Sequence, residues 1–272
     1  MIALEGFAQS GFDGVALKPT EIDLDRVTAT GIETVVIDYE GREHVPDATR
    51  LAELTTETTL RVTTPVRADG FDPLGDDHRS ERLPTGVERI LVAGNPAYLT
   101  ETERKRAVGP RLGAARERTP DAWVGTEGVE RLALAAGGTQ FELLAPTTAH
   151  EVRALRAAGF EGSIAVYAPV VRTDDEDTLL DALGAYVARR GSVAGALDDA
   201  RSERTERTAV ADGAPTDATA NGQARSILLN AIEEFALVGQ PERIDERIEQ
   251  LRAVGVDTIV GYPARGPDAV GR

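Results

Sequence analysis

Eight short runs rich in apolar and β-branched residues alternate along the chain with polar segments of helical spacing. The runs lack strict apolar–polar alternation, as expected of strands buried on both faces of a sheet. Strands that alternate with helices form parallel sheets, and eight such units are what a closed barrel requires. We therefore expect an α/β fold, a (β/α)8 TIM barrel, with strands at Gly14–Lys18, Glu33–Asp38, Thr59–Thr63, Val87–Ala93, Asp121–Gly125, Gln140–Ala145, Ser163–Ala168 and Thr258–Gly261.

Cap residues mark several of the intervening helices. Thr148 and Glu151 have the spacing of a capping box, which predicts a helix that begins there. Pro241 stands where a helix tolerates a missing N–H, and Gly255 stands where that helix should end. A further helix is predicted at about Ala224–Leu237, where apolar residues recur on one side.

Two stretches interrupt this rhythm. Residues 67–86 are acidic and rich in turn residues. Residues 198–222 contain almost no large apolar side chains, so they cannot bury enough surface to order well. Neither stretch is suited to a second domain, and 272 residues suit one barrel. We predict a single TIM-barrel domain over residues 1–272, with a mobile polar insertion at about 198–222, before the last strand.

The charge of the chain limits its environment and its partners. Acidic residues number 46 against 30 basic ones, and Lys18 and Lys105 are the only lysines among the latter. An acidic surface poor in lysine stays hydrated in concentrated salt, where repulsion between carboxylates is screened. This composition indicates a cytoplasmic protein of an extreme halophile. Because the arginines are interleaved with Asp and Glu, no nucleic-acid partner is expected.

Several functional classes are disfavoured by what the sequence lacks. It has no cysteine, which excludes disulfides and thiolate chemistry. Its three histidines, His44, His78 and His150, have no partners at metal-ligand spacing, so no metal site is predicted. No signal-peptide pattern opens the sequence, and no apolar run approaches the roughly 18 residues of a membrane span. We therefore expect no membrane association.

A set of sequence blocks resembles a known family in both composition and order. The most specific blocks lie near the C-terminus, at Val238–Glu242, Ala253–Asp257 and Gly261–Asp268. The blocks that agree before them are Gly31–Asp38, Leu51–Thr58, Leu60–Val66, Val124–Ala136, Phe141–Leu144 and Ala165–Val171. Together they resemble the luciferase-like monooxygenase superfamily, and they are most similar to its deazaflavin-dependent methylenetetrahydromethanopterin reductase branch.

This resemblance covers nearly the whole chain and has functional implications. It implies an oxidoreductase that binds a deazaflavin coenzyme or FMN at the C-terminal end of the barrel and acts on a small molecule. It is also compatible with a homodimer, because the family often forms dimers. The segment from Gly94 to Pro120 is shorter than in the family, which suggests a divergent, shortened member with a trimmed substrate mouth.

The resemblance places the candidate catalytic residues at the end of the second strand. The family often has an acid followed by a histidine there, and this chain has Asp38 and Tyr39. A tyrosine hydroxyl donates a hydrogen bond, but its usual pKa of about 10 makes it a poor proton shuttle at neutral pH. A role for Asp38 in a turn or a helix cap is an equally good interpretation.

The third strand carries the first candidate coenzyme contacts, Thr64 and Val66. Deazaflavin-dependent members have a non-proline cis peptide at this place, beneath the coenzyme. Here Pro65 stands where the family prefers glycine, and an ordinary strand end made rigid by proline is the simpler interpretation.

The turn after the fifth strand carries the candidate phosphate contacts, Gly125, Thr126 and Gly128. Glycines in such a turn let backbone N–H groups approach an anion at a helix N-terminus. Glu127, however, puts a negative charge where the phosphate would bind, and a glutamate in a first helical turn is also explained by the helix dipole.

These departures from the family pattern support an alternative function. A degenerate barrel without a coenzyme, acting as a binding or scaffold protein, is consistent with the missing histidine, with Glu127 and with the shortened mouth. An unrelated barrel enzyme is a third possibility, because a fold does not fix a chemistry.

Overall fold

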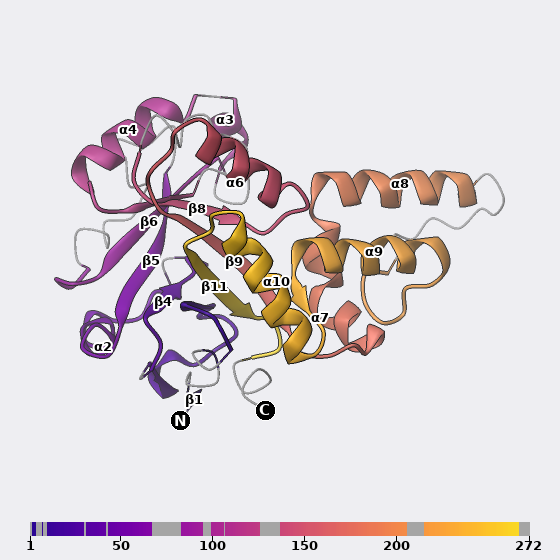
Figure 1. The fold of residues 1–272 in the computed structure, drawn as a ribbon, viewed down its shortest axis with the longest axis horizontal. Coiled ribbons are helices and arrows are strands. Elements are labelled where there is room, and N and C mark those ends of the chain that lie inside the picture. Colours follow the sequence, from indigo (N-terminus) through magenta and orange to yellow (C-terminus); the bar gives the residue numbers. More distant parts are fainter. Residues whose placement is uncertain are drawn as a thin grey trace.

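Eight parallel strands close on themselves in the computed structural model, which describes residues 2–3, 7, 10–29, 31–41, 43–66, 83–94, 99–105, 107–125, 137–205 and 215–266. The last barrel strand pairs with the first, and the prediction of a (β/α)8 TIM barrel is confirmed (Figure 1). The strands follow one another around the barrel as β2 (Gly14–Leu17), β4 (Thr34–Ile37), β5 (Thr59–Val66), β6 (Glu88–Ala93), β7 (Trp123–Gly125), β8 (Gln140–Leu143), β9 (Ile164–Val171) and β11 (Thr258–Pro263). Each coincides with one of the eight predicted runs.

The helices lie around the barrel and to one side of it (Figure 1). They are α2 (Ala48–Leu54), α3 (Glu101–Arg104), α4 (Gly109–Arg118), α6 (Thr148–Ala157), α7 (Glu176–Ala188), α8 (Gly191–Thr205), α9 (Gly222–Phe235) and α10 (Pro241–Ala253). The remaining short elements are β1 (Ile2–Ala3), the 3-10 helix η1 (Leu24–Arg26), β3 (Val27–Thr28) and β10 (Leu237–Val238). In the part of the chain described, no helix is long and apolar enough to cross a bilayer.

The start of α6 differs from the predicted capping box. Thr147 takes the cap position without a side-chain cap bond, and Thr148 is the first helical residue. The Thr148 hydroxyl instead accepts a hydrogen bond from the backbone N–H of Ala145 at 2.8 Å. It therefore fixes the turn between β8 and α6.

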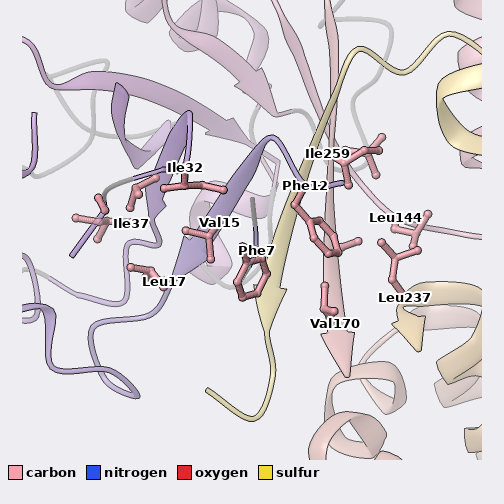
Figure 2. Packing of buried hydrophobic residues seen from close by; sticks show 14 of the residues in the cluster. Phe7, Phe12, Val15, Leu17, Ile32, Ile37, Leu144, Val170, Leu237 and Ile259 are labelled. Atoms are coloured by element: carbon pink, nitrogen blue, oxygen red, sulfur yellow. The ribbon is translucent and has the colours of Figure 1, made fainter. Parts of the chain in front are cut away.

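The largest apolar cluster lies between the strands and the surrounding helices. Figure 2 shows its central part, where Phe12 and Ile259 lie beside Val170 and the strands converge. Ile244, Ile248 and Leu251 place one face of α10 in this cluster, as their i, i+4, i+7 spacing predicts. Every second residue of a strand points outward into this layer. The residues between them face the barrel interior.

The barrel interior is filled by aromatic side chains. Trp123, Phe141, Tyr167 and Tyr262 follow one another with ring-centroid separations of 5.9, 6.0 and 6.1 Å. Beside Trp123, the Arg61 guanidinium carbon lies 4.0 Å from the ring centroid. The series therefore leads through a packed core to the C-terminal end of the strands, where Tyr262 lies.

A helical group beside the barrel has its own apolar cluster. It is formed mainly by α7, α8 and α9, which project away from the barrel in Figure 1. β10 connects it to the barrel by pairing with Val170 and Val171, whereas β8 pairs with β9 only up to Tyr167. Near its C-terminal end, β9 is therefore paired with β10 in place of β8. This pairing places the helical group near the C-terminal end of the barrel.

The polar insertion predicted at residues 198–222 is ordered at both of its described ends. Residues 198–205 form the second half of α8, and Ala220 is buried in the cluster of the helical group. Residues 206–214 lie outside the described part of the chain. Composition did not predict this order, because the apolar contacts of α8 and Ala220 are with residues outside the stretch, such as those of α7 and α9.

Arg156 on α6 joins backbone groups that are distant in the sequence. Its guanidinium donates to the carbonyl oxygens of Gly162 at 2.6 Å and Gly255 at 2.8 Å, and to Asp257 Oδ2 at 2.7 Å. Asp257 Oδ2 also accepts from the backbone N–H of Ile164 at 2.8 Å. The side chain therefore fixes the loops that lead into β9 and β11.

We expect Arg156→Ala to lower the free energy of unfolding by about 2 kcal/mol, because the backbone carbonyls of Gly162 and Gly255 lose their charge-assisted hydrogen bonds to the guanidinium. Urea denaturation measures this loss. Arg153→Ala is the control, since Arg153 lies on the same helix and is exposed. Equal effects of the two substitutions would contradict the role of Arg156.

Candidate functional site

Asp38 lies at the C-terminal end of the barrel, the end called the mouth below. It follows β4 directly, and its backbone N–H donates to the carbonyl oxygen of Leu17 at 2.9 Å, which continues the pairing of β4 with β2. The residue is partly buried. The closed barrel brings to it side chains from strands that lie far away in the sequence.

The carboxyl of Asp38 is paired with Tyr167, whose hydroxyl donates to Oδ2 at 3.1 Å across 129 residues of sequence. Burial raises the pKa of Asp38 from its usual 3.8 to about 6, although Lys18 and the Tyr167 hydrogen bond act in the opposite direction. Burial and the nearby Asp38 raise the pKa of Tyr167 well above its usual value, so this hydroxyl remains a donor. A carboxyl that titrates near pH 6 can both give and take a proton near neutral pH.

Beside this pair, Lys18, Glu21 and Tyr262 form a second group of contacts, called the lysine cluster below. The Lys18 ammonium lies 4.0 Å from the centroid of the Tyr262 ring and 3.5 Å from Glu21 Oε1. The Tyr262 hydroxyl donates to the other oxygen of Glu21. The rings of Tyr262 and Tyr167 stack with an interplanar angle of 15°, so the lysine cluster adjoins the Asp38–Tyr167 pair.

The loops around these residues are connected by hydrogen bonds. Glu40 Oε2 accepts from the backbone N–H and the hydroxyl of Thr20, at 2.9 and 2.6 Å. The backbone N–H of Tyr39 donates to the Thr63 hydroxyl at 2.6 Å. The segments after β2 and β4 are therefore held together at the mouth, and the backbone of Tyr39 is anchored to β5. A catalytic role for the Tyr39 side chain stays a prediction.

The side chains of Thr64 and Val66 lie on the outer face of the barrel. The Thr64 hydroxyl accepts from Arg89 at 3.1 Å, and Val66 packs in an apolar cluster with Leu112 and Ala115 of α4. No peptide bond in the described residues is cis, those on either side of Pro65 included. The structure therefore does not bring these two side chains to Asp38.

Gly125, the first residue of the predicted phosphate turn, lies within β7. A Cβ there would be 3.2 Å from the carbonyl oxygen of Phe141, so glycine allows close approach of β7 to β8. Thr126 and Gly128 lie outside the described residues. Thr64, Val66 and Gly125 thus make packing contacts in the barrel wall, and the coenzyme site that the family resemblance implies stays a prediction. No three potential metal-binding side chains gather anywhere in the described ranges.

Sequence reasoning found Asp38 but missed its partners. Lys18 was noted only as one of two lysines, and Tyr167 was not among the candidate site residues. One pattern could have indicated that Lys18 lies near Asp38: Lys18 ends the first predicted strand, as Asp38 ends the second. Polar residues at such strand ends meet at one end of a parallel barrel.

Comparisons with known proteins give a family and a fold. The model of a family described as "Family of unknown function (DUF7388)" matches residues 7–270. No curated protein matches the sequence. The protein in the crystal structure of apo-MsnO8 is 14% identical in sequence to this chain, and the comparison covers 95% of each chain. The TM-score of 0.52 shows that the two share a fold. The monooxygenase RslO1 from Streptomyces bottropensis is 17% identical over 95% of each chain, with a TM-score of 0.47.

Proposed function

The chain belongs to the DUF7388 family, and we propose that it is an enzyme that exchanges a proton with its substrate through Asp38. The observation that carries this proposal is the Asp38–Tyr167 pair at the mouth. Burial raises the pKa of Asp38 to about 6, and the hydrogen bond from the Tyr167 hydroxyl holds one of its carboxyl oxygens in place, as a group that exchanges a proton requires. Catalytic residues of TIM barrels lie at this end of the strands.

The reaction class we propose is oxidation or reduction of a small molecule by a member of the luciferase-like superfamily. Support comes from the ordered sequence blocks and from a barrel fold shared with apo-MsnO8. In this reaction Asp38 exchanges a proton with the substrate, and Tyr167 holds its carboxyl in place. We propose a deazaflavin or FMN as the coenzyme, bound without the side chains of Thr64 and Val66, which face outward.

A binding or scaffold function is the second candidate. The packed aromatic interior and the outward-facing Thr64 and Val66 favour it, because these features leave no described coenzyme contact at the mouth. In that function Asp38 would hold the mouth together and would not exchange a proton with a substrate.

A coenzyme titration separates the two candidates. The protein is kept in high salt, as its acidic composition requires, and is titrated with FMN and with 8-hydroxy-5-deazaflavin. We expect one of them to change its absorption spectrum on binding and to stabilise the fold, by about 2.7 kcal/mol at a hundredfold excess over Kd. Riboflavin, which lacks the phosphate, is the control for phosphate binding. If neither compound changes its spectrum or raises the Tm, the oxidoreductase proposal is rejected.

A further inference from the structure

Lys18 is an exception in the composition of this chain. Thirty residues are basic, and all but Lys18 and Lys105 are arginine. Lys105 is on the surface with 75% of its side chain exposed, whereas 21% of the Lys18 side chain is exposed. One of only two lysines is thus enclosed at the mouth, beside the proposed proton-transfer group.

The lysine cluster restrains the position of this ammonium group. Lys18 is placed by β2 and is attracted by both the face of the Tyr262 ring and the carboxylate of Glu21. Glu21 is held in turn by the hydroxyl of Tyr262, on β11. Two adjacent barrel strands therefore determine where the positive charge lies.

We propose that Glu21 and Tyr262 are positioning residues that hold the Lys18 ammonium beside Asp38, which follows the neighbouring strand in register, so that the positive charge favours the ionised carboxylate. The proposal rests on the proposed function of Asp38 and adds the group that regulates it. Lys18 is a positioning residue as well, because it acts through Asp38.

Several described groups around Asp38 act on the ionisation of its carboxyl in opposite directions. Lys18 favours the ionised carboxylate, and so does the hydrogen bond from Tyr167 on β9. Burial, Glu21 and Glu40 favour the neutral acid. Tyr262, the remaining titratable neighbour, stays neutral because burial and its bond to Glu21 raise its pKa. Among the described groups that act on Asp38, Lys18 is therefore the one cation, and its removal leaves none of these groups to offset the two glutamates.

The experiment measures the titration of Asp38 in the full-length protein without ligand. Aspartate is labelled with ¹³C at its side-chain carboxyl, the spectrum of Asp38→Asn identifies the Asp38 signal, and the midpoint is followed by NMR at fixed salt. We expect Lys18→Met to raise the midpoint by roughly one pH unit or more, because an opposite charge at this range favours ionisation by that amount. Lys105→Met, which removes the same charge from the surface, is the matched control.

Two further variants test the positioning. Lys18→Arg retains the charge and should keep the midpoint closer to that of the unmodified protein than Lys18→Met does. Tyr262→Phe retains the ring but releases Glu21, and should shift the midpoint in the same direction as Lys18→Met. If Lys18→Met does not fold, Lys18→Gln and Tyr262→Phe provide the comparison.

The proposal is overturned if Lys18→Met and Lys18→Gln, which remove the charge, titrate at the same midpoint as Lys105→Met. Because the midpoint is read without coenzyme or substrate, this result is distinct from failure of the proposed function. Absence of coenzyme binding would reject the oxidoreductase while leaving the role of Lys18 intact.

Discussion

Asp38→Asn is expected to stabilise the protein at pH 8 while removing its proton-transfer group. The pKa of Asp38 is about 6 in the folded chain and 3.8 in the unfolded chain. Between these values the folded state binds more protons, so stability falls as the pH rises from about 4 to 6 and stays lower above that range. The difference of about two units corresponds to at most about 3 kcal/mol.

Asparagine has the shape of aspartate and carries no charge to desolvate, and its oxygen can still accept from Tyr167. The variant should therefore be more stable than the original protein at pH 8, and the difference should vanish near pH 4. Thermal unfolding measured over this pH range checks the prediction. Asp199→Asn, at an exposed position of α8, is the control for removing one negative charge from a chain of net charge −16. A gain that is equal for both variants at every pH would contradict the assignment.

The same substitution is expected to lower turnover by about 100-fold or more, because general acid–base catalysis contributes that much. A gain in stability together with a loss of activity would identify Asp38 as a functional residue, since a purely structural aspartate would lose stability on substitution. Unchanged turnover would exclude proton transfer by Asp38.

Gly184→Ala is expected to disrupt the helical group beside the barrel. Gly184 is buried on α7, and a Cβ there would lie 1.9 Å from the backbone carbonyl oxygen of Thr216. The same backbone segment is tied to α7 by Asp181, which accepts from the N–H of Ala218 at 2.9 Å. Because backbone cannot yield as a flexible side chain does, we expect a loss of about 3 kcal/mol.

Gly195→Ala is the matched control for this substitution. Gly195 lies in α8 of the same helical group, and a Cβ there would meet no atom within 4 Å. Alanine favours helix over glycine by about 1 kcal/mol, so the control should stabilise the protein. Urea denaturation compares the free energies of unfolding, and hydrogen exchange locates the change within the helical group. Equal stability of both variants would show that residues 215–218 do not lie against α7.

Much of the barrel followed from local patterns. All eight strands were predicted from runs of apolar residues, and α10 from Pro241 and the spacing of its apolar stripe. Such signals are reliable because a strand buried on both faces needs a continuous apolar run, and a helix needs one apolar face. The ordered end of the predicted insertion was missed because its order comes from contacts with α7 and α9, which composition does not contain.

The candidate site depended far more on tertiary structure. The family resemblance suggested Asp38 at the end of the second strand, and it also suggested Thr64 and Val66 as coenzyme contacts, whose side chains lie on the outer face. Side chains alternate between the two faces of a strand. A shift of one residue in the predicted alignment therefore moves the expected side chain to the opposite face.

By itself the sequence determined that eight βα units form a barrel, and that polar residues such as Lys18 and Asp38 end its strands. Only the tertiary structure decided that Tyr167 donates to Asp38 and that Tyr262 and Glu21 hold Lys18. The reason is physical. Strand formation depends on neighbours within a few residues, whereas the pKa of Asp38 depends on burial and on charges within a few ångströms. The charged neighbours Lys18, Glu21 and Glu40 lie near Asp38 in the sequence, whereas the hydrogen-bond donor Tyr167 comes from a strand that the closed barrel brings to it across 129 residues.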